Sequence, residues 1–179
     1  MSYTIKPGIS AAELPNWIKR AAKKLSTFED GRVNYQNAEI APIVMCTIVY
    51  KDKLLLVKRS SNLADANGFW STVNGFIDEI KPVYQQVIQE LREELQVVVD
   101  SSMIQVRKSY ILKNPLEKRD YLVFPCLVLL AKKPKIILDS ENTNYVWIKR
   151  AELIDYDTLD DLAFAIDCSL GQKHPPPNS

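Results

Sequence analysis

Three glutamates, Glu90, Glu93 and Glu94, lie close together in the stretch 75–97. An α-helix advances about 100° per residue, so residues three and four apart share a face. Apolar residues recur at four-residue spacing through the same stretch, which predicts a helix over 82–95 that packs on a core. Clustered carboxylates repel one another unless a cation lies among them, and hard oxygen ligands suit Mg²⁺ or Mn²⁺. The spacing indicates either a divalent-metal site or a solvated acidic face.

The segment in front of the predicted helix favours the metal site. Residues 74–79 form a turn-like stretch that contains Gly75 and joins an apolar strand to the helix, whose first turn accommodates Pro82. A strand, a glycine-containing loop and a helix with clustered carboxylates are together suited to hold phosphate groups and a metal ion.

These residues give the sequence a resemblance to the Nudix hydrolase family. The conserved box of that family reads Gly, five residues, Glu, seven residues, then Arg-Glu-apolar-any-Glu-Glu-any-Gly-apolar. The matching positions are Gly75, Glu90, Leu91, Glu93, Glu94 and Val97. The departures are Lys81 in place of the first Glu, Gln89 in place of Arg and Gln96 in place of Gly. A weaker resemblance extends over about 34–153.

The resemblance implies an α/β fold, an α/β/α sandwich with a mixed β-sheet between helices. It also implies that Glu90, Glu93 and Glu94 bind Mg²⁺ or Mn²⁺, and that Glu94 or Glu141 accepts a proton from the attacking water. The expected reaction is hydrolysis of the diphosphate linkage of a nucleoside diphosphate joined to another group, of the nucleotide or nucleotide-sugar type. The alternative is a non-catalytic Nudix-like module that binds a nucleotide or a protein.

Further candidate residues lie outside the three glutamates. Arg59 ends a predicted strand and suits bidentate binding of a substrate phosphate, although a surface arginine explains it equally well. Trp70 has the shape to stack on a base or to pack in the core. Asp78 and Glu141 occupy positions where the resemblance implies acids near the metal, or they only decorate loops.

Length, composition and net charge limit the number of domains and the kinds of partner that are expected. The 179 residues, 46% hydrophobic and 25% charged, predict one domain with an extension. We divide the chain into an N-terminal helical extension over 1–38, a Nudix hydrolase domain over 39–170 and a Pro-rich tail over 171–179. A net charge of +1 argues against nucleic-acid polymers and membranes as partners, so a small nucleotide is expected, and the amphipathic N-terminal helix leaves a homodimer open.

The cysteines and the single histidine exclude other chemistry. Cys46, Cys126 and Cys168 are odd in number and scattered, which indicates reduced core thiols rather than a disulfide or zinc framework. Because the N-terminus also lacks the apolar run of a signal peptide, we predict a cytoplasmic protein. His174 lies in the tail, so a histidine base or a His-based metal site is not expected.

The remaining pattern predicts strands followed in sequence by neighbouring strands, with one helix in mid-chain and one at the end, which again implies a mixed sheet between helices. Expected helices cover 15–25, 82–95 and 159–170, and expected strands cover 41–50, 53–59, 69–73, 103–112, 121–131, 136–138 and 145–149.

Overall fold

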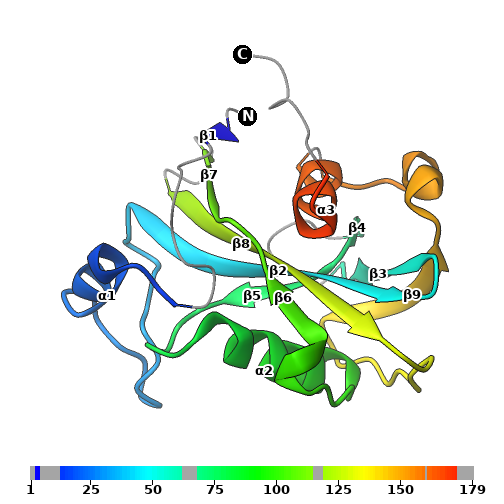
Figure 1. Ribbon diagram of the computed structural model, residues 1–179. Helices are drawn as coiled ribbons and strands as arrows, with labels where there is room; N and C mark the ends of the chain where they lie inside the picture. Colours follow the sequence, from blue (N-terminus) through cyan, green and yellow to red (C-terminus); the bar gives the residue numbers. More distant parts are fainter. Residues whose placement is uncertain (1–2, 5–12, 62–67, 115–118, 160, 173–179) are drawn as a thin grey trace.

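A computed structural model describes residues 3–4, 13–61, 68–114, 119–159 and 161–172. Helices lie on both sides of a mixed sheet (Figure 1). The helices are α1 (Asn16–Ala22), α2 (Val83–Leu95) and α3 (Leu162–Leu170), with short 3₁₀ turns η1 (Ser101–Met103) and η2 (Arg150–Asp155). The strands are β1 (Tyr3–Thr4), β2 (Ile40–Tyr50), β3 (Lys53–Arg59), β4 (Trp70–Ser71), β5 (Val73–Phe76), β6 (Ile104–Val106), β7 (Tyr110–Leu112), β8 (Asp120–Leu130) and β9 (Asn142–Ile148).

The sheet is built around β2 and β8, which run parallel with Cys46 opposite Cys126. The described strands follow the order β1-β7-β8-β2-β3-β4, while β5 pairs with β2, β6 with β8 and β9 with β3. All of these other pairs are antiparallel. The two central strands are rich in β-branched and apolar residues and are buried over most of their length, as expected of strands covered on both faces.

Each face of the sheet carries its own core. Successive side chains of a strand point to opposite faces, so Val44 and Cys46 pack on the side of α2 while Met45 packs on the side of α3. Figure 1 shows α2 below the sheet and α3 above it. The predicted α/β/α sandwich with a mixed sheet between helices is therefore confirmed.

The described part of the predicted N-terminal extension packs on this sandwich. Leu14 and Ile18 join the core between α2 and the sheet, and Ala22 packs with Tyr35 and Ala41. β1 adds a short strand beside β7. The division into 1–38, 39–170 and 171–179 stays a prediction, and the tail from 173 onward, with His174, lies outside the described residues.

Three expected strands differ from those observed, each because of its pairing. The expected strand 69–73 is two strands, since β4 pairs with β3 whereas β5 pairs with β2. The expected strand 103–112 is divided into β6 and β7 opposite Pro125, which has no N–H to continue the ladder. The expected strand 136–138 is wrong, because Ile137 donates its backbone N–H to the Leu95 carbonyl at the end of α2 instead.

The other elements follow the expected pattern closely. Helix α2 begins after Pro82 and ends at Leu95, as predicted, while α1 and α3 are shorter than expected. The three cysteines are free thiols, with Cys46 and Cys126 fully buried. None of the helices in the described residues has the length and apolar character that crossing a membrane requires.

Candidate functional site

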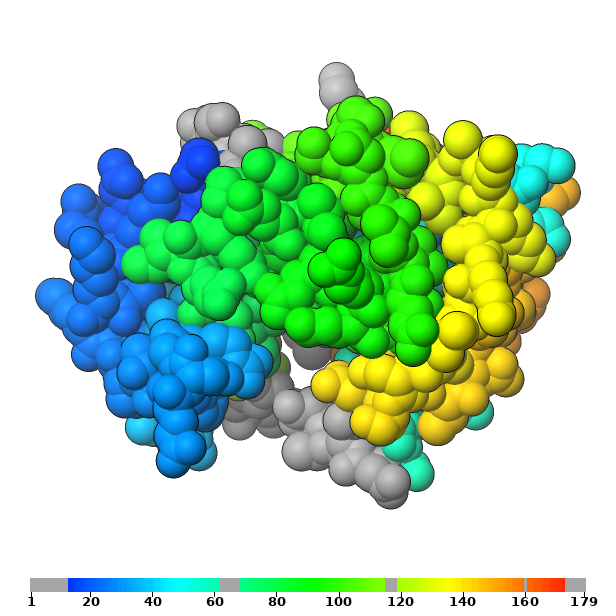
Figure 2. All heavy atoms as spheres, turned by 90° about the horizontal axis from the view of Figure 1, so that it is seen from below, coloured from blue at the N-terminus to red at the C-terminus, as the bar shows by residue number. Residues whose placement is uncertain are grey.

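Helix α2 presents the three glutamates at the rim of its buried face. The stripe formed by Val83, Val87, Leu91 and Leu95 is completely buried and fixes the rotation of the helix on the sheet. That rotation buries Glu94, which is 5% exposed, leaves Glu90 half-buried and exposes Glu93. In Figure 2, which views this face, α2 in green lies between the blue N-terminal segment and the yellow segment that follows β8.

Each of the three carboxylates accepts a hydrogen bond from a neutral side-chain amide. Gln86 Nε2 donates to Glu90 Oε1 at 2.5 Å, Gln89 Nε2 donates to Glu93 Oε1 at 2.9 Å and Asn142 Nδ2 donates to Glu94 Oε2 at 2.8 Å. No Lys or Arg in the described part of the chain forms an ion pair with any of the three. The carboxylates are thus oriented by dipoles and their charge is not compensated.

Burial and mutual repulsion therefore favour the protonated forms of the two inner acids. Burial, together with the smaller effect of the charges of Glu93, Asp78 and Glu141, raises the pKa of Glu90 to about 7. Burial also raises the pKa of Glu94 to about 8, with the neighbouring charges of Glu90 and Glu141 acting in the same direction. The amide hydrogen bonds offset only part of this effect, since a dipole stabilises a carboxylate less than a cation does.

The Glu90 carboxylate lies directly on the backbone of β5 at Gly75, so a side chain at this position would displace the carboxylate. A Cβ atom at position 75 would fall 1.9 Å from Glu90 Oε1, a distance at which something must shift. Gly75 lies within β5, opposite Val44 of β2, rather than in the turn expected from the sequence. Its role is close approach of a side chain to the main chain, a common reason for glycine inside a strand.

The residues present match a hard divalent cation in their chemistry. Glu90 and Glu94 are desolvated acids that no Lys or Arg of the described segments compensates, and carboxylate oxygens are the ligands that Mg²⁺ and Mn²⁺ prefer. Within the described ranges, no group of three or more Asp, Glu, His or Cys side chains is already gathered closely enough to hold one ion. Glu93, on the exposed side of the same turn, is the third acid available.

Glu141 and Asp78 both lie near these glutamates. The exposed Glu141 is close enough that its charge raises the pKa of both Glu90 and Glu94, and its carbonyl accepts the Ser60 N–H at 2.7 Å. Asp78 forms an ion pair with Arg32 at 3.3 Å through Oδ2, while its buried Oδ1 has no hydrogen-bond partner in the described structure. Asp78 is thus partly committed to a structural contact.

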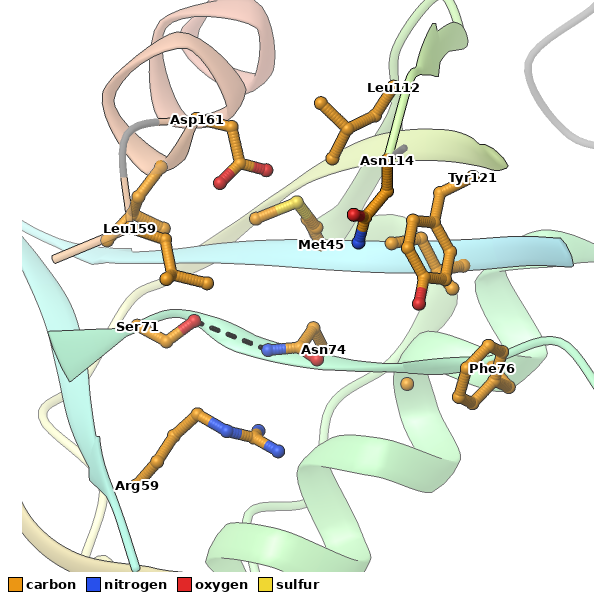
Figure 3. A pocket seen from close by; sticks show the side chains of 13 residues that line it. Met45, Arg59, Ser71, Asn74, Phe76, Leu112, Asn114, Tyr121, Leu159 and Asp161 are labelled. Atoms are coloured by element: carbon orange, nitrogen blue, oxygen red, sulfur yellow. Dashed lines mark hydrogen bonds between the residues drawn. The ribbon is translucent and has the colours of Figure 1, made fainter. Parts of the chain in front are cut away.

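A cavity of about 200 Å³ lies on the opposite face of the sheet, beneath α3. Apolar side chains such as Met45, Leu112 and Leu162 form much of its lining, and Arg59, Ser71, Asn74 and Tyr121 add polar groups (Figure 3). Ser71 accepts a hydrogen bond from the Asn74 amide at 3.3 Å, which fixes one wall. An apolar cavity with a few polar groups is typical of small-molecule binding.

The cavity and the carboxylates meet at Gly75 and Arg59. Gly75 lines the cavity and also contacts Glu90. Arg59 lines the cavity and lies opposite Asn142, the residue that donates to Glu94. The buried Nε of Arg59 has no hydrogen-bond partner among the described residues, so its guanidinium group is available to an anion.

Trp70 lies elsewhere. Its ring packs edge-on against Tyr156, with centroids 5.3 Å apart, and joins the core on the side of α3. It does not line the cavity described above. Trp70 thus packs against the core, and base stacking by its partly buried ring stays a prediction.

The three departures from the Nudix box form two local arrangements. Lys81 Nζ donates to Gln89 Oε1 and also to Glu79 Oε2, the latter at 2.8 Å. Gln96 ends α2 with a φ of 55°, a left-handed conformation in which glycine is favoured. Lys81 and Gln89, which occupy two of the departing positions, are therefore in direct contact.

Two residues that contact the carboxylates were missed in the sequence. Gln86 precedes Glu90 by one helical turn, a spacing that could have identified it. Asn142 reaches Glu94 from β9, 48 residues away, so only the tertiary structure reveals the pair.

Solved structures of similar fold are known. The chain is similar to a MutT protein from Methanosarcina mazei Go1 (17% identity, 72% of this chain and 90% of that chain, TM-score 0.59). It is similar to the Nudix domain of Shewanella oneidensis NrtR complexed with ADP-ribose (21%, 73% and 86%, TM-score 0.61). It is also similar to a C. elegans Ap4A hydrolase (14%, 73% and 96%, TM-score 0.58).

No protein-family model and no curated protein sequence matches the chain. The structural similarities nevertheless define the fold, which is that of the Nudix hydrolases. The resemblance predicted from residues 75–97 is confirmed at this level.

Proposed function

We propose that this protein is a Nudix hydrolase that uses Mg²⁺ or Mn²⁺ to cleave the diphosphate linkage of a nucleoside diphosphate joined to another group. The observation that carries the proposal is the double contact of Gly75. It lines a cavity that could hold a small organic group on one side, and it touches the Glu90 carboxylate on the other. A substrate that bridges these two places needs both an organic group and a phosphate group that a cation can bind.

Glu90, Glu93 and Glu94 are the residues that would hold the cation. When bound, a divalent cation neutralises charge on the bridging phosphates and makes the attacked phosphorus more electrophilic. The burial of Glu90 and Glu94 supports this assignment, because a cation would relieve an unfavourable charge that no Lys or Arg of the described residues compensates.

Arg59 would bind a phosphate oxygen from the side of the cavity. Its buried and unpartnered Nε supports this role, because a guanidinium group recognises phosphate through paired N–H donors. The cavity beneath α3 would hold the nucleoside or the second organic group. Two of the similar structures, an Ap4A hydrolase and a Nudix domain complexed with ADP-ribose, support a nucleotide of this general kind.

Glu141 and Glu94 are the candidates for accepting the proton of the attacking water. Glu141 is exposed and lies near both Glu90 and Glu94. A water held between these acids and a substrate phosphate would be within reach of the Glu141 carboxylate. Glu94 is the more buried of the two. Its ionised form, which could accept a proton, is favoured only when a bound cation offsets the charges of the neighbouring acids.

The test is a panel of ADP-ribose, diadenosine tetraphosphate, nucleotide sugars and nucleoside triphosphates, each with Mg²⁺ or Mn²⁺, read by release of phosphate or nucleoside monophosphate. Glu93→Gln should abolish product release, while Glu29→Gln, an exposed glutamate on the N-terminal segment, should leave it unchanged. Nucleotide binding that needs no metal, with no product from any substrate, would instead establish the non-catalytic binding module. The absence of a preassembled group of three acids in the described residues is the observation that keeps this second function under test.

A further inference from the structure

We propose that Lys81 and Gln89 together act as positioning residues for Glu93. Lys81 fixes the orientation of the Gln89 amide, and that amide holds one carboxylate oxygen of Glu93 so that the other oxygen is left for a cation. This inference rests on the proposed function, in which Glu93 is a metal ligand.

Two hydrogen bonds link Lys81, Gln89 and Glu93, and each donor lies on the Lys81 side of its acceptor. Lys81 Nζ donates to Gln89 Oε1, and Gln89 Nε2 donates to Glu93 Oε1 at 2.9 Å. The Lys81 side chain is 13% exposed and a second contact with Glu79 holds it in place. An ammonium group fixed at two acceptors restricts the amide that it contacts far more than a mobile surface lysine would.

The chemistry of lysine determines which way the amide points. An ammonium group can only donate, so the oxygen of Gln89 must face Lys81 and the nitrogen must face Glu93. The orientation of a glutamine amide is otherwise ambiguous. A carboxylate at position 81, as in the family box, would attract the amide nitrogen instead and turn the Gln89 oxygen against Glu93.

Lysine at 81 and glutamine at 89 are therefore a matched pair. The residue in contact with Glu93 is neutral, so Glu93 keeps its full charge for a cation. Outer partners that orient metal ligands typically contribute 10–100-fold to metal affinity. The two departures from the box thus support Glu93 through an ammonium group and an amide.

Coulomb attraction and positioning predict opposite signs for a change at Lys81, which makes the inference testable. Replacing Lys81 by Glu adds negative charge near the acids, so simple electrostatics predicts tighter cation binding. Positioning predicts weaker binding, because the Gln89 amide would turn away from Glu93.

The experiment is calorimetric titration of Mn²⁺ into the full chain at neutral pH, with thermal unfolding as the check on folding. We expect Lys81→Glu and Gln89→Leu each to weaken Mn²⁺ binding about tenfold, the lower end of the range for outer partners. Lys81→Arg keeps both the charge and the donor and should bind as the wild type does. In the Gln89→Leu background, Lys81→Glu should cause no further weakening, since the amide through which it acts is gone.

Tighter or unchanged binding by Lys81→Glu would overturn the positioning role, and so would equal weakening in both backgrounds. These failures differ from failure of the proposed function. If the wild type itself binds no Mn²⁺, the metal site is refuted and the positioning role with it; if the wild type binds and the variants match it, only the positioning role is refuted.

Discussion

Helices α2 and α3 both bury carboxylates against the central sheet, and they treat the charge in opposite ways. On α3, the Asp167 side chain is 2% exposed and receives two hydrogen bonds of 2.6 Å from the guanidinium group of Arg150. On α2, Glu94 is 5% exposed and receives one hydrogen bond from the neutral amide of Asn142. The chain supplies a cation to one buried acid and only a dipole to the other.

The difference distinguishes a structural charge from one that, under the proposed function, a cation would compensate. A buried charge without a partner costs several kcal/mol, so a chain that needs it only for folding pairs it, as at Arg150 and Asp167. The acids of α2 lack that pairing within the described residues, and their neighbours are further acids. A ligand that supplies the missing positive charge would stabilise the folded state by binding it selectively.

The largest expected effect is the loss of turnover when Glu93, a proposed metal ligand, is replaced. Glu93→Gln should lower turnover on the order of a thousandfold, because the loss of one ligand carboxylate removes charge stabilisation that the transition state needs. Steady-state rates with the best substrate of the panel measure this. Unchanged Mn²⁺ binding in this variant would remove Glu93 from the metal site.

Glu141 is expected to act on the rate more than on binding. Glu141→Gln should lower kcat about a hundredfold and leave KM within a few-fold, the pattern of a group that acts mainly in the transition state. Wild-type turnover in Glu141→Gln would make Glu94 the remaining candidate for the base.

Replacing the buried acid of α3 and the buried acid of α2 by amides should change the stability of the fold in opposite directions. Asp167→Asn should destabilise the fold by about 2 kcal/mol, because Arg150 would remain partly buried without its partner. Glu94→Gln should stabilise the metal-free protein above neutral pH, because it removes an uncompensated buried charge. Urea unfolding of both variants without metal compares them directly, and destabilisation of both would end the distinction between the two helices.

The smallest expected effect concerns the ends of the two helices. Gly171 caps the C-terminus of α3 with a φ of 74°, whereas Gln96 caps the C-terminus of α2 with a φ of 55°. Gln96→Gly should stabilise the protein by up to about 1 kcal/mol and Gly171→Ala should destabilise it by about the same amount, since only glycine adopts this conformation without strain. Thermal unfolding of both variants tests the pair, and a destabilising Gln96→Gly would indicate a side-chain contact at the helix end.

The sequence predicted what depends on local spacing. The helix over 82–95 and the main strands follow from periodicity, and the structure contains them. Gly75 was identified as important for the wrong reason, a turn, because close approach by Glu90 depends on how the helix docks. Asn142 and the cavity beneath α3 arise from strands far apart in the sequence, and nothing local marks them.

Thermal unfolding across pH, with and without Mg²⁺, tests most directly the central claim that the acids of α2 require a cation. Burial raises the pKa of Glu90 to about 7 and of Glu94 to about 8, from an ordinary value of 4.5. The folded state therefore holds these protons more tightly than the unfolded state, and the stability that they contribute is lost as the pH rises from about 4.5 through 8.

The account predicts that the metal-free protein melts at progressively lower temperature over this range, and that Mg²⁺ restores the melting temperature at the alkaline end. Glu94→Gln should show a smaller loss and a smaller restoration. Melting curves of the wild type that Mg²⁺ and Mn²⁺ leave unchanged at every pH would contradict the claim.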